Sequence, residues 1–204
     1  MKSRLGISVV IAVLFSSVPA ALATHGPPHD CLGFAITSVS LQATNGNDTL
    51  DGTSARDVIA AGNGFDIING KAGNDALCGN EVGDNIFGQG GSDSINGGAG
   101  ADAIEGNSGT SLLIGGSEND FIAGGGSGDT MQGDLGDDDM GGRGDNDTVQ
   151  GNDNNDELAD GKGSDVINGG TGTDTWFQCK DMTAEQQVVN IEVTMGPNTA
   201  FCAF

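Results

Sequence analysis

A nine-residue pattern of acidic and apolar positions runs through the chain from residue 48 to residue 176. Every ninth position from 48 to 174 holds Asp, except that Ser111 interrupts the series. An apolar residue follows each of these positions by two residues in all fifteen units, as Leu50, Ile59 and Ile68 do at the start. Gly stands two residues before the Asp position in nine units and four residues after it in twelve. A linker or a random acidic chain would not keep these phases together, so the period predicts a repeat fold.

Each unit combines a glycine turn with a short strand. Gly-x-Gly-x-Asp is typical of tight turns because Gly adopts positive φ, and x-apolar-x predicts a strand of three residues with its central side chain pointing inward. One such strand cannot bury its apolar face alone. We therefore expect an all-β fold, a parallel β-roll (β-solenoid) of about fifteen nonapeptide units with two units per coil. Two thin sheets would face each other across one file of aliphatic side chains.

The two ends of the chain do not follow the repeat. Lys2 and Arg4, an apolar run at residues 7–15 and the small-x-small sequence at 21–23 predict a secretory signal peptide that is cleaved near Ala23. No later stretch is apolar enough for a membrane span, so we expect a secreted, extracellular product. The predicted organisation is a signal peptide at 1–23, an N-terminal leader and cap at 24–44, the β-roll at 45–179 and a C-terminal cap at 180–204. Residues 188–193 are a candidate for one last strand.

The charge of the chain restricts its partners. Without the signal peptide, five basic residues face 29 acidic ones on 181 residues, a net charge near -24. Nucleic acid and anionic membranes would be repelled, whereas a cation is the natural counterpart. Such acidity, with no Tyr and one Trp, also suits a disordered chain. The unbroken period argues against that alternative.

Two units per coil would place the Asp of each unit beside the Asp of the second unit along, in two files. The first file is Asp48, Asp66, Asp84, Asp102, Asp120, Asp138, Asp156 and Asp174. The second is Asp57, Asp75, Asp93, Asp129, Asp147 and Asp165, with Ser111 in its middle. Stacked carboxylates oppose folding, and the aliphatic file is too small to compensate. Calcium accepts both carboxylate and turn carbonyl oxygens, while magnesium demands stricter geometry, so we expect several Ca²⁺ ions and folding coupled to calcium.

The repeat resembles the Gly-Gly-x-Gly-x-Asp-x-apolar-x unit of the RTX (repeats-in-toxin) calcium-binding β-roll family over residues 45–179. The order Cys31, GNDTLDG, DVIAAGNGFDIING, NDALCGN also resembles small secreted bacterial calcium-binding proteins without a catalytic domain. The resemblance implies calcium held by Asp side chains of adjacent turns together with turn carbonyls. One ion for each intact Asp pair gives about eleven ions, with weakened binding beside Ser111.

Departures from the pattern mark weak points of the repeat. Other residues replace the Gly two positions before Asp in six units, and a β-branched Val82 would be strained there if the position needs positive φ. We expect the extra acids between 135 and 161 to be solvated surface residues and not additional metal ligands.

Four cysteines in an exported chain predict two disulfides, for which three pairings exist. We favour Cys31 with Cys78 and Cys179 with Cys202, because neighbour pairing would close both ends of a roll that needs caps.

These features predict a secreted, structural or surface-associated calcium-binding protein and not an enzyme. Residues 24–44 cannot hold a catalytic domain, and neither His-Glu-x-x-His nor Gly-x-Ser-x-Gly occurs. Ice binding would need a regular outward Thr row, which is missing. Adhesion stays an alternative, because an outward apolar patch could form from Val58, Ile67, Leu112, Phe121 and Val166. The sequence identifies no protein or glycan partner.

Overall fold

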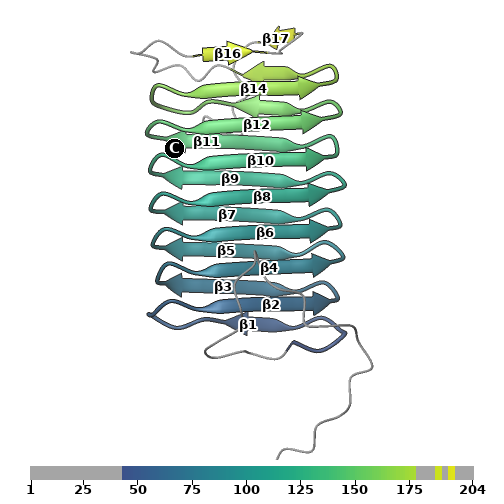
Figure 1. The fold of residues 1–204 in the computed structure, drawn as a ribbon, viewed down its shortest axis with the longest axis vertical. Helices are drawn as coiled ribbons and strands as arrows, with labels where there is room; N and C mark the ends of the chain where they lie inside the picture. The colour runs from purple at the N-terminus through teal and green to yellow at the C-terminus, as the bar shows by residue number, and fades with distance from the viewer. Residues whose placement is uncertain (1–42, 178–186, 190–192, 196–204) are drawn as a thin grey trace, which may run out of the picture.

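A computed structural model describes residues 43–177, 187–189 and 193–195, and its elements are all β-strands. The strands form two parallel sheets that wind into one roll (Figure 1). Consecutive strands alternate between the sheets, and a strand pairs with the strand 18 residues further on, as Leu50 pairs with Ile68. The predicted parallel β-roll with two units per coil is therefore confirmed.

The nine-stranded sheet contains, in spatial order, β1 (Thr49–Asp51), β3 (Ile67–Ala72), β5 (Asn85–Gly90), β7 (Ala103–Ser108), β9 (Phe121–Gly126), β11 (Asp139–Gly144), β13 (Glu157–Ala159), β15 (Thr175–Phe177) and β17 (Val193–Met195). The eight-stranded sheet contains β2 (Val58–Asn63), β4 (Ala76–Glu81), β6 (Ser94–Ala99), β8 (Leu112–Ser117), β10 (Thr130–Leu135), β12 (Thr148–Asp153), β14 (Val166–Thr171) and β16 (Gln187–Val189). Among the described residues, no helix has the length and hydropathy that crossing a membrane requires.

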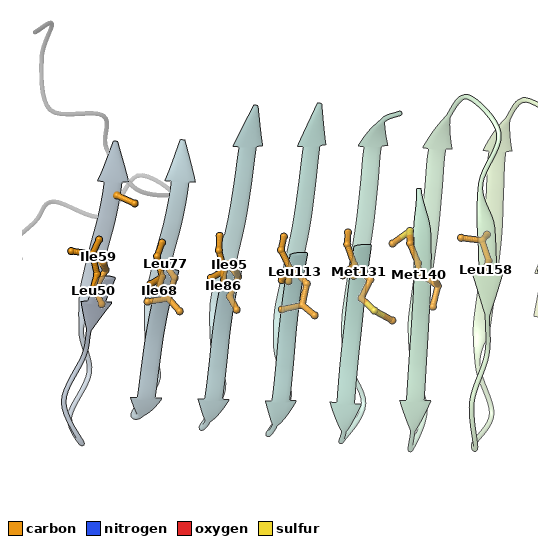
Figure 2. Packing of buried hydrophobic residues seen from close by; sticks show 14 of the residues in the cluster. Leu50, Ile59, Ile68, Leu77, Ile86, Ile95, Leu113, Met131, Met140 and Leu158 are labelled. Carbon is orange, nitrogen blue, oxygen red and sulfur yellow. The ribbon is translucent and has the colours of Figure 1, made fainter. Parts of the chain in front are cut away.

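The core is a single file of side chains between the two sheets (Figure 2). The repeated apolar residues from Leu50 to Ile167 are 0–5% exposed, and Trp176 packs against them while partly buried. The second inward position of the six-residue strands is Gly in most units, as in β3 and β5, so the apolar interior is narrow.

Most strands are twice as long as the sequence pattern predicted. Strands such as β3 and β5 have six residues instead of three, and their pairing continues past the Gly at the fourth place, where Lys71 pairs with Gln89. Both of those residues have positive φ. Because every coil repeats the same backbone distortion at the same place, adjacent strands stay in register through it.

The C-terminal strand prediction also needs correction. The structure has two short strands where the sequence suggested one across 188–193: β16 joins β14 in one sheet, and β17 joins β15 in the other. Val188 pairs with Ile167, 21 residues before it, so three extra residues interrupt the 18-residue coil there. Both sheets thus continue past residue 179.

The predicted outward apolar patch is not continuous. Val58, Leu112 and Val166 belong to the eight-stranded sheet, whereas Ile67 and Phe121 belong to the nine-stranded one. Consecutive units alternate between sheets, so these side chains divide between two outer faces. Val58 is also only 6% exposed.

Candidate metal centre

The phased Asp residues lie at the turns before the strands and are enclosed by the roll. Those from Asp57 to Asp174 are 0–3% exposed, while Asp48, in the first turn, is half-buried. Ionisable side chains are almost never buried to this degree unless they are paired or ligate a metal. The site must therefore account for a whole series of buried carboxyl groups.

One oxygen of each buried carboxyl group takes part in a hydrogen-bonded ladder. The backbone N–H of Asp48 donates to Oδ1 of Asp66 over 2.7 Å, and the N–H of Asp66 donates to Oδ1 of Asp84 in the same way. The pattern repeats every 18 residues along both files as far as Asp165 and Asp174. Ser111 keeps the ladder intact, since its Oγ accepts the N–H of Asp93 at 3.1 Å. The structure thus brings together the two files that the sequence predicted.

The second carboxyl oxygen, Oδ2, is buried without a hydrogen-bond partner in most of the series. It is in this state in Asp66, Asp75, Asp84, Asp93, Asp102, Asp120, Asp129, Asp138, Asp147, Asp156 and Asp174. An unsatisfied buried acceptor is costly and calls for a missing ligand. The repetition of the same unsatisfied atom shows that this is a property of the repeat.

A glycine and a backbone carbonyl adjoin each of these Oδ2 atoms where the surroundings are recorded. A Cβ added at Gly70 would lie 2.8 Å from Oδ2 of Asp75 and 2.8 Å from the carbonyl oxygen of Gly88. The corresponding distances at Gly124 are 2.7 Å to Oδ2 of Asp129 and 2.8 Å to the carbonyl of Gly142. Both oxygens are acceptors that border the position a Cβ would take, so a group that bound both of them would have to be a hydrogen-bond donor or a cation.

Burial is the main cause that raises the pKa values of these carboxyl groups, and it outweighs the backbone hydrogen bond that lowers them. The pKa of Asp75 is raised to about 6, that of Asp102 to about 7 and that of Asp147 to about 8. Neighbouring carboxylates add to the rise, as Asp165 and Asp129 do for Asp147. Burial thus favours the protonated form of these groups, and a bound cation would favour the ionised form instead.

The first acid of each file, Asp48 or Asp57, differs from the rest. Oδ2 of Asp57 accepts hydrogen bonds from the backbone N–H of Thr53 at 2.5 Å and from its hydroxyl at 3.0 Å. Thr44 satisfies Oδ2 of Asp48 in the same manner. These two carboxylates thus have donors of their own, unlike the later members of each file.

The donor set fits calcium. Within the described residues, no three His, Cys, Asp or Glu side chains gather as a metal-binding group. The unsatisfied Oδ2 atoms are the side-chain oxygens available to an ion between two coils, and its remaining ligands would be turn carbonyls or water. Calcium takes six to eight oxygens of this mixed kind in flexible geometry.

Comparison with known families decides the identity of the repeat. The RTX calcium-binding nonapeptide repeat (4 copies) matches residues 42–77, 79–113, 105–140, 114–149 and 141–175. The chain belongs to this RTX repeat family. RTX nonapeptide repeats bind calcium, and the family is typically structural. The chain matches no curated protein and no solved structure.

Most RTX units have left-handed backbone at two positions, and sequence reasoning found only one of them. The place two residues before Asp has positive φ in four of the six units that lack Gly there, and Val82 adopts φ 72° despite its β-branched side chain. The place five residues after Asp has positive φ too, for example in Lys71 and Arg143. Gly or Asn at that place in nine units was a signal that could have revealed it.

A second ladder in the RTX turns was also missed. Asn47 accepts the backbone N–H of Phe65 through its side-chain oxygen at 3.1 Å, and Asn146 accepts that of Ser164 at 2.7 Å. These residues directly precede the phased Asp. The recurrence of Asn at that place was the available signal, and its role is to tie successive turns together.

The unphased acids and the cysteines stand apart from the repeated sites. Asp137 is exposed and accepts the N–H of Asn155, which suits the predicted surface role. Asp160 departs from that expectation. It stands four residues after Asp156, where most units have the Gly that borders Oδ2, and it is 0% exposed. Cys78 is 5% exposed in β4 and is not a free cysteine. Cys31, Cys179 and Cys202 lie outside the described residues, so the disulfide pairing stays a prediction.

Proposed function

We propose that the protein is a secreted, non-catalytic, structural β-roll whose folding is coupled to the binding of several calcium ions by its phased Asp residues. The observation that carries the proposal is the repeated pair of a buried, unsatisfied Oδ2 and a nearby carbonyl oxygen. Calcium would supply positive charge between these oxygens. The chain's own residues fix the two oxygens in place. The Oδ1 hydrogen bonds hold the Asp side chain, and the Gly four residues after the Asp position, here called the glycine cradle, leaves room for Oδ2.

The candidate ligands are not equivalent along the roll. Asp66, Asp84 and the later members of the first file offer an unsatisfied Oδ2 at successive coils up to Asp174. The second file is divided by Ser111, which provides no such oxygen. Asp48 and Asp57 complete the files, but their Oδ2 atoms are bonded to Thr44 and Thr53, so their contribution to binding should be smaller.

The same proposal includes an extracellular location. The segment 1–23 has the sequence features of a cleaved signal peptide, and RTX repeat proteins are typically secreted. Extracellular calcium at millimolar levels matches the affinity of sites built from few charged ligands. Sequencing the N-terminus of the exported protein should give Thr24 as its first residue, and an uncleaved or unexported chain would contradict secretion.

Adhesion through an outer face is the weaker function. The outward apolar residues divide between the two faces, and the largest exposures among them are 36% for Phe121 and 38% for Val166. Single exposed apolar residues are common on soluble surfaces. Nothing in their arrangement therefore favours a partner over solvent.

The break at Ser111 offers a sharp test of the calcium sites. Ser111→Asp would keep the ladder and add the missing Oδ2, so the exported protein should bind at least one more Ca²⁺ per chain. Ser111→Asn is the matched control, because it adds an acceptor of the same size without a carboxylate. Calorimetric titration and native mass spectrometry in calcium would count the ions. Equal stoichiometry in the two variants would overturn the assignment of the sites.

A further inference from the structure

An apolar cluster lies on the outer face of the eight-stranded sheet, apart from the core file. It consists of Val58 and Ala60 in β2 with Ala76 and Cys78 in β4, and β2 and β4 lie at the N-terminal end of the roll (Figure 1). These residues flank the inward residues of their strands and so point away from the core. This apolar cluster distinguishes β2 and β4 from the other strands of the sheet.

The burial of the cluster is unusual for its position. Val58, Ala76 and Cys78 are 6%, 1% and 5% exposed. The equivalent residues of β6 and β10 in the same sheet, Ser94 and Thr130 among them, are polar and half-buried. Small side chains on strands about 4.8 Å apart in one flat face cannot shield each other from above. A covering segment is needed over β2 and β4 and not over the strands that follow.

We infer that the N-terminal segment, residues 24–42, docks across this outer face and is tied to it by a disulfide between Cys31 and Cys78. The proposal is independent of calcium binding. Its first support is the chemistry of the segment: Leu32, Phe34 and Ile36 alternate along it, as in a strand that presents one apolar side. The segment joins the roll at Ala43, which packs at the same end of the core.

The reach of the chain supports the same occupant. A disulfide needs Cα atoms within about 6.8 Å. Cys31 precedes Ala43 by 12 residues, a reach of about 40 Å from a residue that packs at the N-terminal end of the core. Cys179 follows Phe177 by two residues, a reach of about 7 Å, whereas β4 lies five strand steps from β14, or about 24 Å. Cys202 could approach Cys78 only with its seven-residue connection from Met195 fully extended along the roll.

This docking would give the segment a role different from closing the end of the roll. It would fix the first two coils from the side. Those coils contain Asp48 and Asp57, whose carboxylates are bonded to Thr44 and Thr53. The N-terminal coils would then hold their structure through covalent and hydrogen-bonded contacts, and the later coils through calcium.

Peptide mapping of the exported, unreduced protein tests the covalent part. A Cys31–Cys78 peptide is expected. A Cys78–Cys202 peptide would assign the face to the C-terminal segment, and a Cys78–Cys78 dimer would assign it to a second copy of the chain. Either result overturns the proposal.

Limited proteolysis in saturating calcium tests the docking itself. Val58→Ser should speed cleavage within residues 24–42 at least fivefold, because it removes the apolar contact. Leu112→Ser is the matched control, since Leu112 holds the same place in β8 and is half-buried, and it should leave the rate unchanged. Circular dichroism would verify that both variants keep the roll. Equal cleavage rates in the two variants would refute docking on this face.

Discussion

Eleven of the phased Asp residues use their two carboxyl oxygens differently. Oδ1 accepts a backbone N–H from the coil before, while Oδ2 is buried without a donor. The sequence predicted that the acids stack, because the period of nine and the pairing of units fix their order. It could not predict the division between oxygens, which depends on the side-chain rotamer and on the turn geometry.

Asp102→Asn should stabilise the calcium-free roll. The amide oxygen can keep the hydrogen bond to the N–H of Asp84, while an NH₂ group replaces the buried unsatisfied acceptor with a donor. We expect a gain of about 1–3 kcal/mol in the free energy of unfolding, measured by urea titration in chelator at about pH 6, before the calcium-free roll loses its structure.

Asp57→Asn is the control for that experiment. Its Oδ2 already accepts two hydrogen bonds from Thr53, so an NH₂ group in its place would meet donors. This variant should not gain stability. A similar gain in both variants would show that the effect comes from charge alone and not from the unsatisfied Oδ2 acceptor.

Val82→Gly should relieve backbone strain. Val82 has φ 72°, a region that disfavours β-branched residues by about 1–3 kcal/mol. Ser127 holds the same place in its unit without positive φ, so Ser127→Gly serves as control. Thermal unfolding in calcium should show a higher Tm for the first variant and a lower or equal Tm for the second. The reverse order would contradict the strain at Val82.

At the scale of the element, the strands follow the turns more than their own sequences. The pattern correctly predicted the three strand residues around each buried apolar side chain. It did not predict that pairing continues beyond the Gly. Strand propensity gives no reason for Lys71 and Gln89 to pair, and they do so only because both coils share one backbone distortion. Repeat symmetry, and not local preference, sets the strand length.

Gly97→Ala should destabilise the roll at β6. A Cβ there would contact Oδ2 of Asp102 and lie 2.7 Å from the carbonyl of Gly115. Ala61 occupies the same place in an early coil, so the roll can shift for one methyl group, and we expect a loss of only about 1–3 kcal/mol. Calcium affinity should fall as well, since both oxygens are displaced.

Gly126→Ala provides the comparison for Gly97→Ala. A Cβ at Gly126 would meet nothing within 4 Å, and its φ is not positive. Urea unfolding with and without calcium should leave this variant unchanged or slightly more stable. If the two alanine variants behaved alike, the glycine cradle would have no role in the site.

For the whole molecule, the core file and the two acid files followed from the period of nine together with two units per coil, whereas the extra strands β16 and β17 did not. The outer faces did not, because nothing in the repeat shows which outward residues will be covered. Val58 is the clearest case, since the sequence placed it outward and the structure buries it.

The calcium-free roll should depend on pH in an unusual direction. The pKa values of the buried Asp residues are raised from 3.8 to about 6 in Asp129, about 7 in Asp84 and about 8 in Asp120, mainly by burial. The folded state therefore favours the protonated acids, and their contribution is complete below about pH 4 and is lost as the pH rises through about 6–8. Far-ultraviolet circular dichroism in chelator should show β structure at pH 4 that disappears by pH 8. Structure that instead grows with pH in chelator would contradict the burial of these acids.

The most direct measurement is a high-resolution crystal structure of the exported protein grown in calcium at neutral pH. The account predicts Ca²⁺ ions between the coils at about 2.3–2.6 Å from Oδ2 of residues such as Asp84 and Asp102, with turn carbonyls among their ligands. Gaps that hold only water, or Oδ2 atoms that donate a proton to the neighbouring carbonyl, would contradict it.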